Sequence, residues 1–155
     1  MPALLMPATS RYTLGKSERL HGRNAVEDLF QKAKRSSMAV FPLRAVFAVD
    51  ISEESEETAG VRILVSVSKR HFKRAVKRNR CKRQVREAYR KQKHALQDIV
   101  EGCPAAHLSV AFIWLADELR PTEEVEKAMT TLLARIGEKT QRIIHAAAEA
   151  EGKEA

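Results

Sequence analysis

The sequence predicts a single α+β domain, in which amphipathic helices cover a β-sheet. The chain has 155 residues and 44% of them are apolar, which is enough for one moderate hydrophobic core and too little for a second full domain. Residues 43–49 and 61–67 have an apolar side chain at every second position, with the period of two that half-buried strands show. These side chains are Leu43, Ala45, Phe47 and Val49 in the first segment and Val61, Ile63, Val65 and Val67 in the second. Other segments space their apolar residues three and four apart, as helices on a sheet do.

The first helix is expected from about Asn24 to Lys34, after a flexible tail at residues 1–16. Asn24 and Glu27 stand three positions apart, as in a helix-capping box, and apolar residues follow at helical spacing. Strands are expected from Phe41 to Val49 and from Val61 to Val67. The segment between them, DISEESEETAG, has five acidic residues and no apolar period, which is typical of a solvated connection.

A long second helix is expected from about Lys73 to Ile99, and Gly102 and Pro104 end it. Its apolar side, able to pack on a sheet, is centred on Cys81 and continues with Val85, Ala88, Gln92, Ala95 and Leu96. The opposite side is a cationic stripe made of Asn79, Lys82, Arg83, Arg86, Arg90 and Lys93. Arg78 and Arg80 lie off this stripe, so they either brace the adjacent turn or reach around the helix.

The last two elements are a buried strand and a covering helix. Residues Leu108 to Leu115 are apolar almost throughout, which indicates a strand in the interior of the sheet. Pro121 and Thr122 open a helix with an acidic first turn, as the helix dipole favours. Its apolar stripe comprises Val125, Ala128, Met129, Leu132, Leu133 and Ile136. The domain is expected to span residues 17–140, and residues 141–155 to form a helix extension and an acidic tail that frays beyond about Ala146.

Positive charge is concentrated in one segment. From Lys69 to Lys93, 13 of 25 residues are Lys or Arg and Glu87 is the only acid, for a net charge of +12. The whole chain carries +8, so the other 130 residues together carry −4. A folded surface tolerates such self-repulsion most often because it binds phosphates. Nucleic acid is therefore the first partner to consider, ahead of a solvated surface, a membrane or an acidic protein.

Several other classes of protein are disfavoured. Cys81 and Cys103 form no CxxC pair, and His71, His94 and His107 lack metal-ligand spacing with them, so neither a disulfide scaffold nor a zinc site is expected. The amino-terminal MPALLMPATS lacks a signal-peptide pattern, and no run approaches the ~18 apolar residues of a membrane helix. We expect a cytoplasmic protein without membrane contact.

The order of residues in the basic segment is more specific than its charge. The stretch SVSKRHFKRAVKRNRCKRQVREAYR resembles the signature of the protein subunit of bacterial ribonuclease P, in which a strand leads to a helix with Arg-Asn-Arg, a Lys-Arg pair and an Arg-Glu-aromatic group. The matching residues are Arg78-Asn79-Arg80, Lys82-Arg83 and Arg86-Glu87 with Tyr89. ERLHGRNAVEDLFQKAKRSSMAVFPLRAVFAV is similar to the amino-terminal pattern of that family, so the resemblance covers about residues 16–137.

The resemblance implies a two-layer αβββαβα domain, with a four-stranded sheet and a left-handed βαβ crossover through the basic helix. This is the ribonuclease P protein, or ribosomal protein S5 domain 2-like, fold. The residue pattern alone shows three strands. The fourth is expected in or beside Ser36 to Val49, or within a hairpin from Asp50 to Val67.

The resemblance also implies an activity and its partners. The family protein joins a large catalytic RNA, which we expect here as a 1:1 complex with a protein monomer, and helps to remove the 5′ leader of precursor tRNA. The chemistry belongs to Mg²⁺ bound mainly by the RNA and to an attacking water, so no residue of the chain is expected to be catalytic or to hold a metal. The rival hypothesis is a non-catalytic RNA-binding protein, such as a ribosome-associated factor.

Two binding surfaces follow from the resemblance. The first should contact the catalytic RNA, since guanidinium groups bind phosphate in a bidentate geometry. It comprises Arg74, Lys77, Arg78, Asn79, Arg80, Lys82, Arg83, Arg86 and Arg90. The second is a cleft between the first helix and the sheet that should hold the single-stranded leader, where aromatic rings can stack on bases. It comprises Val26, Phe30, Phe41, Arg44, Ser66, Ser68 and Lys69.

The cleft is also where the chain departs from the family pattern. Val26 stands where a second aromatic is frequent, Arg44 where a tyrosine is common, and Ala33 where the family often has glycine. We therefore expect weaker stacking and stronger charge contact with the leader. For Phe30 and Phe41, burial in the hydrophobic core is the alternative role.

Overall fold

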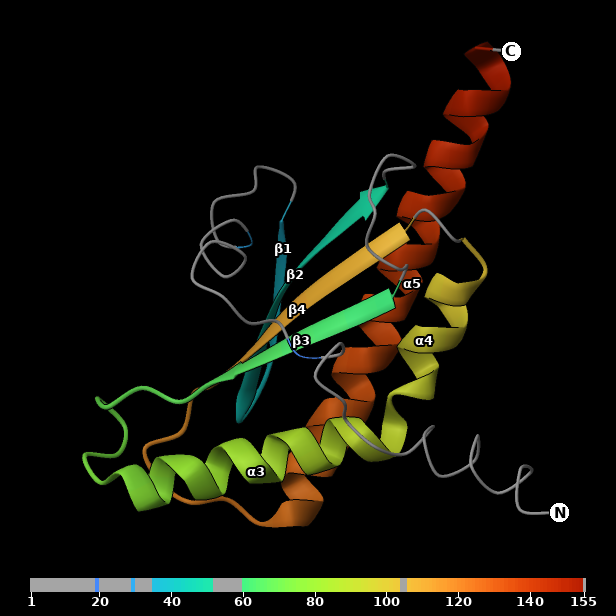
Figure 1. The fold of residues 1–155 in the computed structure, drawn as a ribbon. Helices are drawn as coiled ribbons and strands as arrows, with labels where there is room; N and C mark the ends of the chain where they lie inside the picture. The colour runs from blue at the N-terminus through green and yellow to red at the C-terminus, as the bar shows by residue number, and fades with distance from the viewer. Residues whose placement is uncertain (1–18, 20–28, 30–34, 52–59, 104–105, 155) are drawn as a thin grey trace, which may run out of the picture.

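The structure, a computed structural model, describes residues 19, 29, 35–51, 60–103 and 106–154. Within these residues a four-stranded sheet lies against three helices (Figure 1). The elements, in chain order, are β1 (Ser36–Val40), β2 (Leu43–Ile51), β3 (Gly60–Ser66), α3 (Ala75–Gln92), α4 (His94–Glu101), β4 (Ala106–Trp114) and α5 (Thr122–Glu154). This order confirms the expected βββαβα succession. The expected first helix and the tail at 1–16 fall almost wholly outside the described residues.

The sheet has the order β1-β2-β4-β3, so β4 occupies an interior position as its apolar sequence predicts. Strand β2 runs antiparallel to both β1 and β4, while β3 runs parallel to β4. The parallel pair is joined through α3 and α4, which confirms that the basic helix lies in a β-α-β crossover. In Figure 1, β3 and β4 run in the same direction. Helix α3 passes near the carboxyl end of β3, from which a loop leads to it.

The three helices cover one face of the sheet (Figure 1). Helix α5 packs mainly against β1 and β2, while α4 packs against β3 and β4 and α3 against β3. The predicted stripe of α5 is buried throughout, from Val125 to Ile136. The stripe shares one hydrophobic core with inward residues of the strands, among them Phe47, Ile63 and Phe112, each at most 2% exposed. This face holds the main hydrophobic core of the domain.

The opposite face of the sheet carries a smaller apolar cluster. Val46, Ala48 and Ala111 are buried there against Leu29, which is helical and 1% exposed. Leu29 is the described part of the expected first helix. The amino-terminal segment therefore covers part of this second face through at least that residue.

The basic segment forms two helices, and the prediction of one helix from Lys73 to Ile99 is wrong. Helix α3 ends at Gln92 and α4 begins at His94, with Lys93 between them. The direction changes there, as Figure 1 shows, although no Gly or Pro marks the position. Lys93 is 1% exposed rather than part of the cationic stripe, and Ala95 is exposed rather than buried. Leu96 is packed in the core, and this packing fixes which side of α4 faces inward.

The fourth strand is β1, which resolves the open alternatives in favour of the segment before Val49. The expectation that a strand begins at Phe41 is wrong. Phe41 and Pro42 instead form a two-residue turn between β1 and β2, with a cis peptide bond between them. Pro42 is buried, and its carbonyl oxygen accepts a hydrogen bond from the backbone N–H of Leu115 at 2.8 Å. The turn is thereby fixed to the end of β4.

Helix α5 begins at Thr122, as predicted, and continues to Glu154. The extension beyond the sheet is visible in Figure 1 as the segment that ends at the carboxyl terminus. Fraying beyond Ala146 concerns the motion of this extension and stays a prediction, as do the domain limits at residues 17 and 140.

Candidate nucleic-acid interface

Helix α3 has a fully buried side that fixes how its other side is presented. Cys81, Val85 and Ala88 are at most 1% exposed, which confirms the predicted packing side. Tyr89 is buried as well, and the centroid of its ring lies 6.0 Å from that of Phe112 in the sheet. The helix therefore cannot rotate without exposing an aromatic core contact.

The outward side of α3 is cationic, and we call it the basic face. It consists of Asn79, Arg80, Lys82, Arg83, Arg86 and Arg90. Asn79, Arg80 and Arg83 are exposed, and the other three are half-buried. Because no acid other than Glu87 lies on α3, this face offers closely spaced cations to a polyanion.

A second arginine, Arg19, lies near enough to Arg86 to act on its charge. The backbone of Arg19 forms an isolated parallel bridge with Ile63 of β3, which places it beside that edge of the sheet. Burial, and after it the charge of Arg19, lowers the pKa of Arg86. Arg19 thus extends the basic face beyond α3. Sequence reasoning missed it, although it belongs to the ERLHGR segment that matched the family pattern.

Arg90 is paired within the helix. Its Nε donates to Glu87 Oε2 at 3.0 Å and its Nη2 donates to Glu87 Oε1, one turn away. This hydrogen bonding lowers the pKa of Glu87, so the carboxylate is ionised at neutral pH. A phosphate that binds Arg90 must therefore compete with Glu87.

Arg78 braces the turn that precedes α3, which was one of its two expected roles. Its Nη1 donates to the carbonyl oxygens of Phe72 at 2.9 Å and Lys73 at 2.8 Å. Arg80 lies off the predicted stripe, but its side chain is exposed, so we count it in the basic face. The two arginines of the Arg-Asn-Arg group thus have different surroundings, and RNA contact by either stays a prediction.

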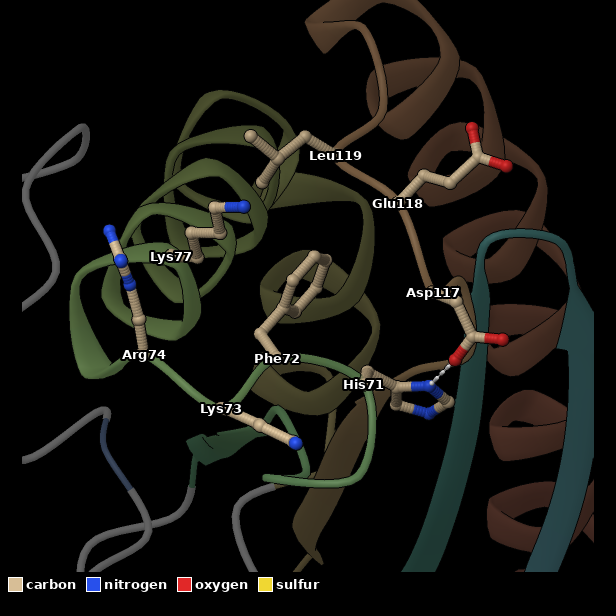
Figure 2. Close-up of a pocket in the computed structure, with 8 residues that line it drawn as sticks. All are labelled: His71, Phe72, Lys73, Arg74, Lys77, Asp117, Glu118 and Leu119. Atoms are coloured by element: carbon tan, nitrogen blue, oxygen red, sulfur yellow. Dashed lines mark hydrogen bonds and ion pairs between the residues drawn. The ribbon is translucent and has the colours of Figure 1, made fainter.

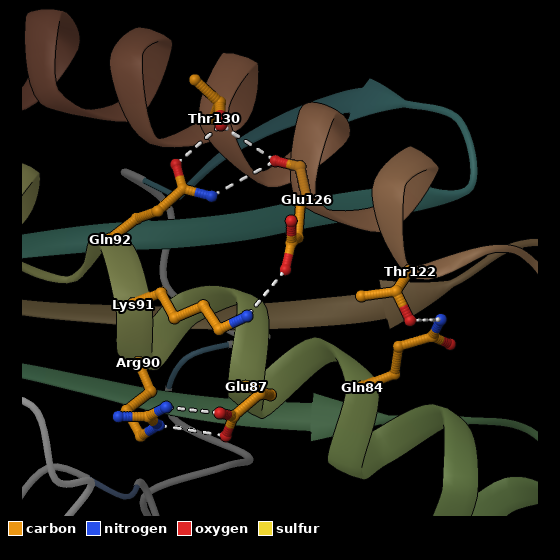
Figure 3. Close-up of polar contacts among 8 residues, drawn as sticks. All are labelled: Gln84, Glu87, Arg90, Lys91, Gln92, Thr122, Glu126 and Thr130. Atoms are coloured by element: carbon orange, nitrogen blue, oxygen red, sulfur yellow. Dashed lines mark hydrogen bonds and ion pairs between the residues drawn. The ribbon is translucent and has the colours of Figure 1, made fainter.

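A row of polar contacts joins the remaining edge of α3 to α5 (Figure 3). Gln84 Nε2 donates to Thr122 Oγ1 at 3.2 Å, and Lys91 Nζ lies 3.1 Å from Glu126 Oε1. The hydroxyl of Thr130 donates to Gln92 Oε1 at 2.7 Å. These contacts hold the helix so that its basic face points away from α5.

Four of the expected leader-binding residues lie at one end of the sheet. They are Arg44, Ser66, Ser68 and Lys69. Arg44 and Ser66 both pair with Ile113, so they lie in the same cross-strand row on the face opposite α5. Ser68 and Lys69 come two and three residues after the end of β3, and both are exposed. Arg44 Nε donates to Ser37 Oγ at 2.9 Å, which directs its guanidinium along this face.

Phe41 lies at the same end of the sheet but faces a different neighbour. Its side chain is 57% exposed, so the alternative of a core role is wrong. The guanidinium carbon of Arg120 lies 5.5 Å from the centroid of the ring, in a cation–π contact. Arg120 precedes α5 and also pairs with Glu124 Oε2 at 2.7 Å. Sequence reasoning gave no signal for this contact, since the two residues are far apart in the chain.

The remaining expected site residues are placed as follows. Val26 and Phe30 lie outside the described residues, and only Leu29 of that segment is seen on the second face of the sheet. Arg74 and Lys77 line a pocket at the start of α3. The structure therefore groups the residues expected to bind the catalytic RNA on and just before α3. The described residues expected to bind the leader form a second group at the end of the sheet.

Together, the basic face and the polar sheet end define an RNA-binding protein built on a four-stranded α+β domain. Residues 14–137 match the sequence model of the family described as Ribonuclease P. The chain is 40% identical over 131 residues to the "Ribonuclease P protein component" of Porphyromonas gingivalis, covering 84% of this chain and 91% of that protein. It is 32% identical over 107 residues to the protein of the same name from Chlorobium phaeobacteroides, covering 66% and 72%. The chain therefore belongs to the ribonuclease P protein family.

Solved structures show the same fold. The ribonuclease P proteins of Thermotoga maritima and Staphylococcus aureus each superpose with a TM-score of 0.57 at 20% identity. Each match covers 76% of this chain, with 96% of the first protein and 94% of the second. The chain functions as an RNA-binding subunit of ribonuclease P in tRNA processing, which decides against the ribosome-associated alternative. In the described part of the chain, no helix has the length and apolar character needed to span a bilayer.

Proposed function

We propose that the basic face of α3 binds the catalytic RNA of ribonuclease P. The observation that carries this proposal is the separation of roles around α3, with Val85 and Tyr89 fully buried and Arg80 and Arg83 exposed on the other side. A rigid helix that presents arginines at intervals of three and four residues matches phosphates along an RNA strand. Arg19, beside Arg86, widens the surface available to the same RNA.

On this proposal the sheet end receives the 5′ leader of precursor tRNA. Arg44, Ser66, Ser68 and Lys69 supply one guanidinium, two hydroxyls and one ammonium at that end. These groups suit phosphates and ribose hydroxyls of a single strand. Phe41 supplies an exposed aromatic ring on which a base can stack.

The proposed chemistry belongs to the RNA partner and its Mg²⁺, which activates a water for attack on the phosphodiester. The residues of this chain bind and orient the two RNAs and offset the repulsion between their phosphates. Among the described residues no group of three or more His, Cys, Asp or Glu side chains could hold a metal ion. We propose a 1:1 complex, in the cytoplasm, of one chain with one catalytic RNA.

Reconstitution tests this function. The purified chain is mixed with a bacterial catalytic RNA, and cleavage of precursor tRNA is measured at low Mg²⁺, where the RNA alone is slow because phosphate repulsion is poorly screened. We expect strong stimulation by the chain and none by the same chain after heat denaturation. Absence of stimulation with several bacterial RNAs would count against the proposal.

A further inference from the structure

An open pocket lies where the turn before α3 faces the loop between β4 and α5. Its volume is about 470 Å³, which is within the range of pockets that hold small organic groups. The lining residues are His71, Phe72, Lys73, Arg74 and Lys77 from one side and Asp117, Glu118 and Leu119 from the other. Figure 2 shows the ring of Phe72 between the two segments, with Lys77 and Leu119 close above it.

The lining has a cationic part, an apolar part and two acidic residues, Asp117 and Glu118. Both acids have basic partners, since Asp117 lies 2.6 Å from His71 and Glu118 lies 3.8 Å from Arg120. Lys73, Arg74 and Lys77 are all exposed, so their charges are available to an anion. Phe72 is 7% exposed and forms part of the main core, and Leu119 packs against the same core. The pocket thus has an apolar surface, formed by Phe72 and Leu119, and three positive charges around it.

Contacts on both sides hold the pocket open in this shape. His71 Nδ1 lies 2.6 Å from Asp117 Oδ1 and so joins the two loops (Figure 2). The backbone N–H groups of His71 and Phe72 both donate to the carbonyl oxygen of Ser68, at 3.1 and 3.4 Å. Arg78 fixes the carbonyl oxygens of Phe72 and Lys73, as described above. A site held in this way loses little conformational entropy when a ligand binds.

We propose that this pocket binds one unpaired nucleotide of the bound RNA, with its phosphate against Lys77 and its base over Leu119 and the exposed edge of Phe72 (Figure 2). Lys73 and Arg74 point away from this place and add positive charge around it. A free inorganic anion would use the cations and leave the apolar part unused, whereas a nucleotide uses both. The RNA is the expected source because Lys77 and the basic face belong to the same helix. This inference rests on the proposed function, since it names a further contact of the same RNA.

Titration of the free, full-length chain with the dinucleotide pApA tests the site, with NMR amide signals as the readout. We expect saturable shifts at Phe72, Lys77 and Leu119. Inorganic phosphate at the same concentration should shift the Lys77 region only, and adenosine should shift none of the three at comparable concentration. Equal effects of pApA and inorganic phosphate at Leu119, or no saturable shift there, would overturn the proposal.

Two substitutions separate the pocket from general electrostatics. Lys77→Gln removes a pocket cation, and Leu119→Glu places a repelling charge on the apolar part without changing α3. Each should weaken pApA binding at least about fivefold, as loss of a phosphate contact or of base stacking predicts. Lys127→Gln, at an exposed lysine of α5, is the matched control and should leave binding unchanged. A drop with Lys77→Gln and none with folded Leu119→Glu would overturn the nucleotide assignment.

Folding and function are controlled separately. Leu119 packs against the core, so a melt accompanies Leu119→Glu, and Leu119→Ser replaces it if that variant does not fold. Binding of pApA at the pocket without stimulated cleavage would support the site and contradict the proposed function. Stimulated cleavage with no pApA shift at Leu119 would overturn the site alone. Binding of an acidic peptide with the same shifts as pApA would overturn the assignment to RNA.

Discussion

Arg78 and Phe72 are joined by a hydrogen bond of 2.9 Å from the guanidinium Nη1 to the backbone carbonyl oxygen. The same nitrogen reaches the carbonyl oxygen of Lys73 at 2.8 Å, so one side chain holds two consecutive peptide groups. This contact fixes the turn from which α3 starts, and with it the direction of the basic face. The first arginine of Arg-Asn-Arg therefore acts within the protein, whatever it contacts in the RNA.

The first prediction compares Arg78→Gln with Arg80→Gln. Gln is too short to hold both carbonyl oxygens, so Arg78→Gln should lower the free energy of unfolding by about 1–2 kcal/mol, in line with half-buried hydrogen bonds to a charged group. Arg80→Gln should change it by less than about 0.5 kcal/mol, because its side chain is exposed. Urea melts without RNA measure both. Equal stabilities would show that the brace contributes nothing.

The second prediction concerns Arg83 and Arg86 on the basic face. The double change Arg83→Ala with Arg86→Ala should lower the slope of log affinity for the catalytic RNA against log salt by about one to two units. Stability should change little, because Arg83 is exposed and burial beside Arg19 already disfavours the charge of Arg86. Filter binding across a salt series measures the slope. An unchanged slope would mean that these arginines are only solvated.

The third prediction tests the buried side of the same helix with a matched control. Val85 is fully buried and Val76 is 79% exposed, yet both lie on α3. Val85→Asp should destabilise the domain by several kcal/mol, since an unpaired charge enters the core. Val76→Asp should leave the melt nearly unchanged. If both variants melt like the parent, the orientation of α3 assigned above is wrong.

The sequence predicts the elements whose pattern depends on local periodicity. The alternation at 61–67 places Val61, Ile63, Val65 and Val67 inside, and the stripe of α5 is buried at every expected position. These predictions succeed because one face of each element meets a continuous core, so the period of apolar residues is enforced by burial.

Features that depend on distant parts of the chain could not be predicted in this way. The break at Lys93 has no local breaker, and the packing of Leu96 and Val100 against other elements imposes it. The contact between Phe41 and Arg120 joins a turn to a helix start far along the chain. Arg19 reaches the basic face only because its backbone pairs with Ile63. The pattern of charges along the sequence does not show which of these distant residues come close together in the fold.

The fourth prediction concerns the pairing of Arg90 with Glu87. Glu87→Gln removes the carboxylate that competes with phosphate, so affinity for the catalytic RNA should rise by about twofold to tenfold at low salt. The pKa of Glu87 is lowered by its hydrogen bond from Arg90, so the carboxylate is charged, and the gain should be full, at neutral pH. Glu138→Gln, at an exposed position of α5, controls for net charge. Equal gains from both changes would exclude a specific competition.

The fifth prediction tests whether Phe41 contacts the leader. The ring is 57% exposed, so Phe41→Ala should cost far less stability than loss of a buried phenylalanine, which costs about 3–5 kcal/mol. If a leader base stacks on the ring, affinity of the assembled enzyme for precursor tRNA should fall by about 1–3 kcal/mol. Affinity for leaderless tRNA should stay the same, because that substrate has no strand to place at the sheet end. A variant that keeps its full preference for the leader would show that Phe41 serves only to support Arg120, 5.5 Å away.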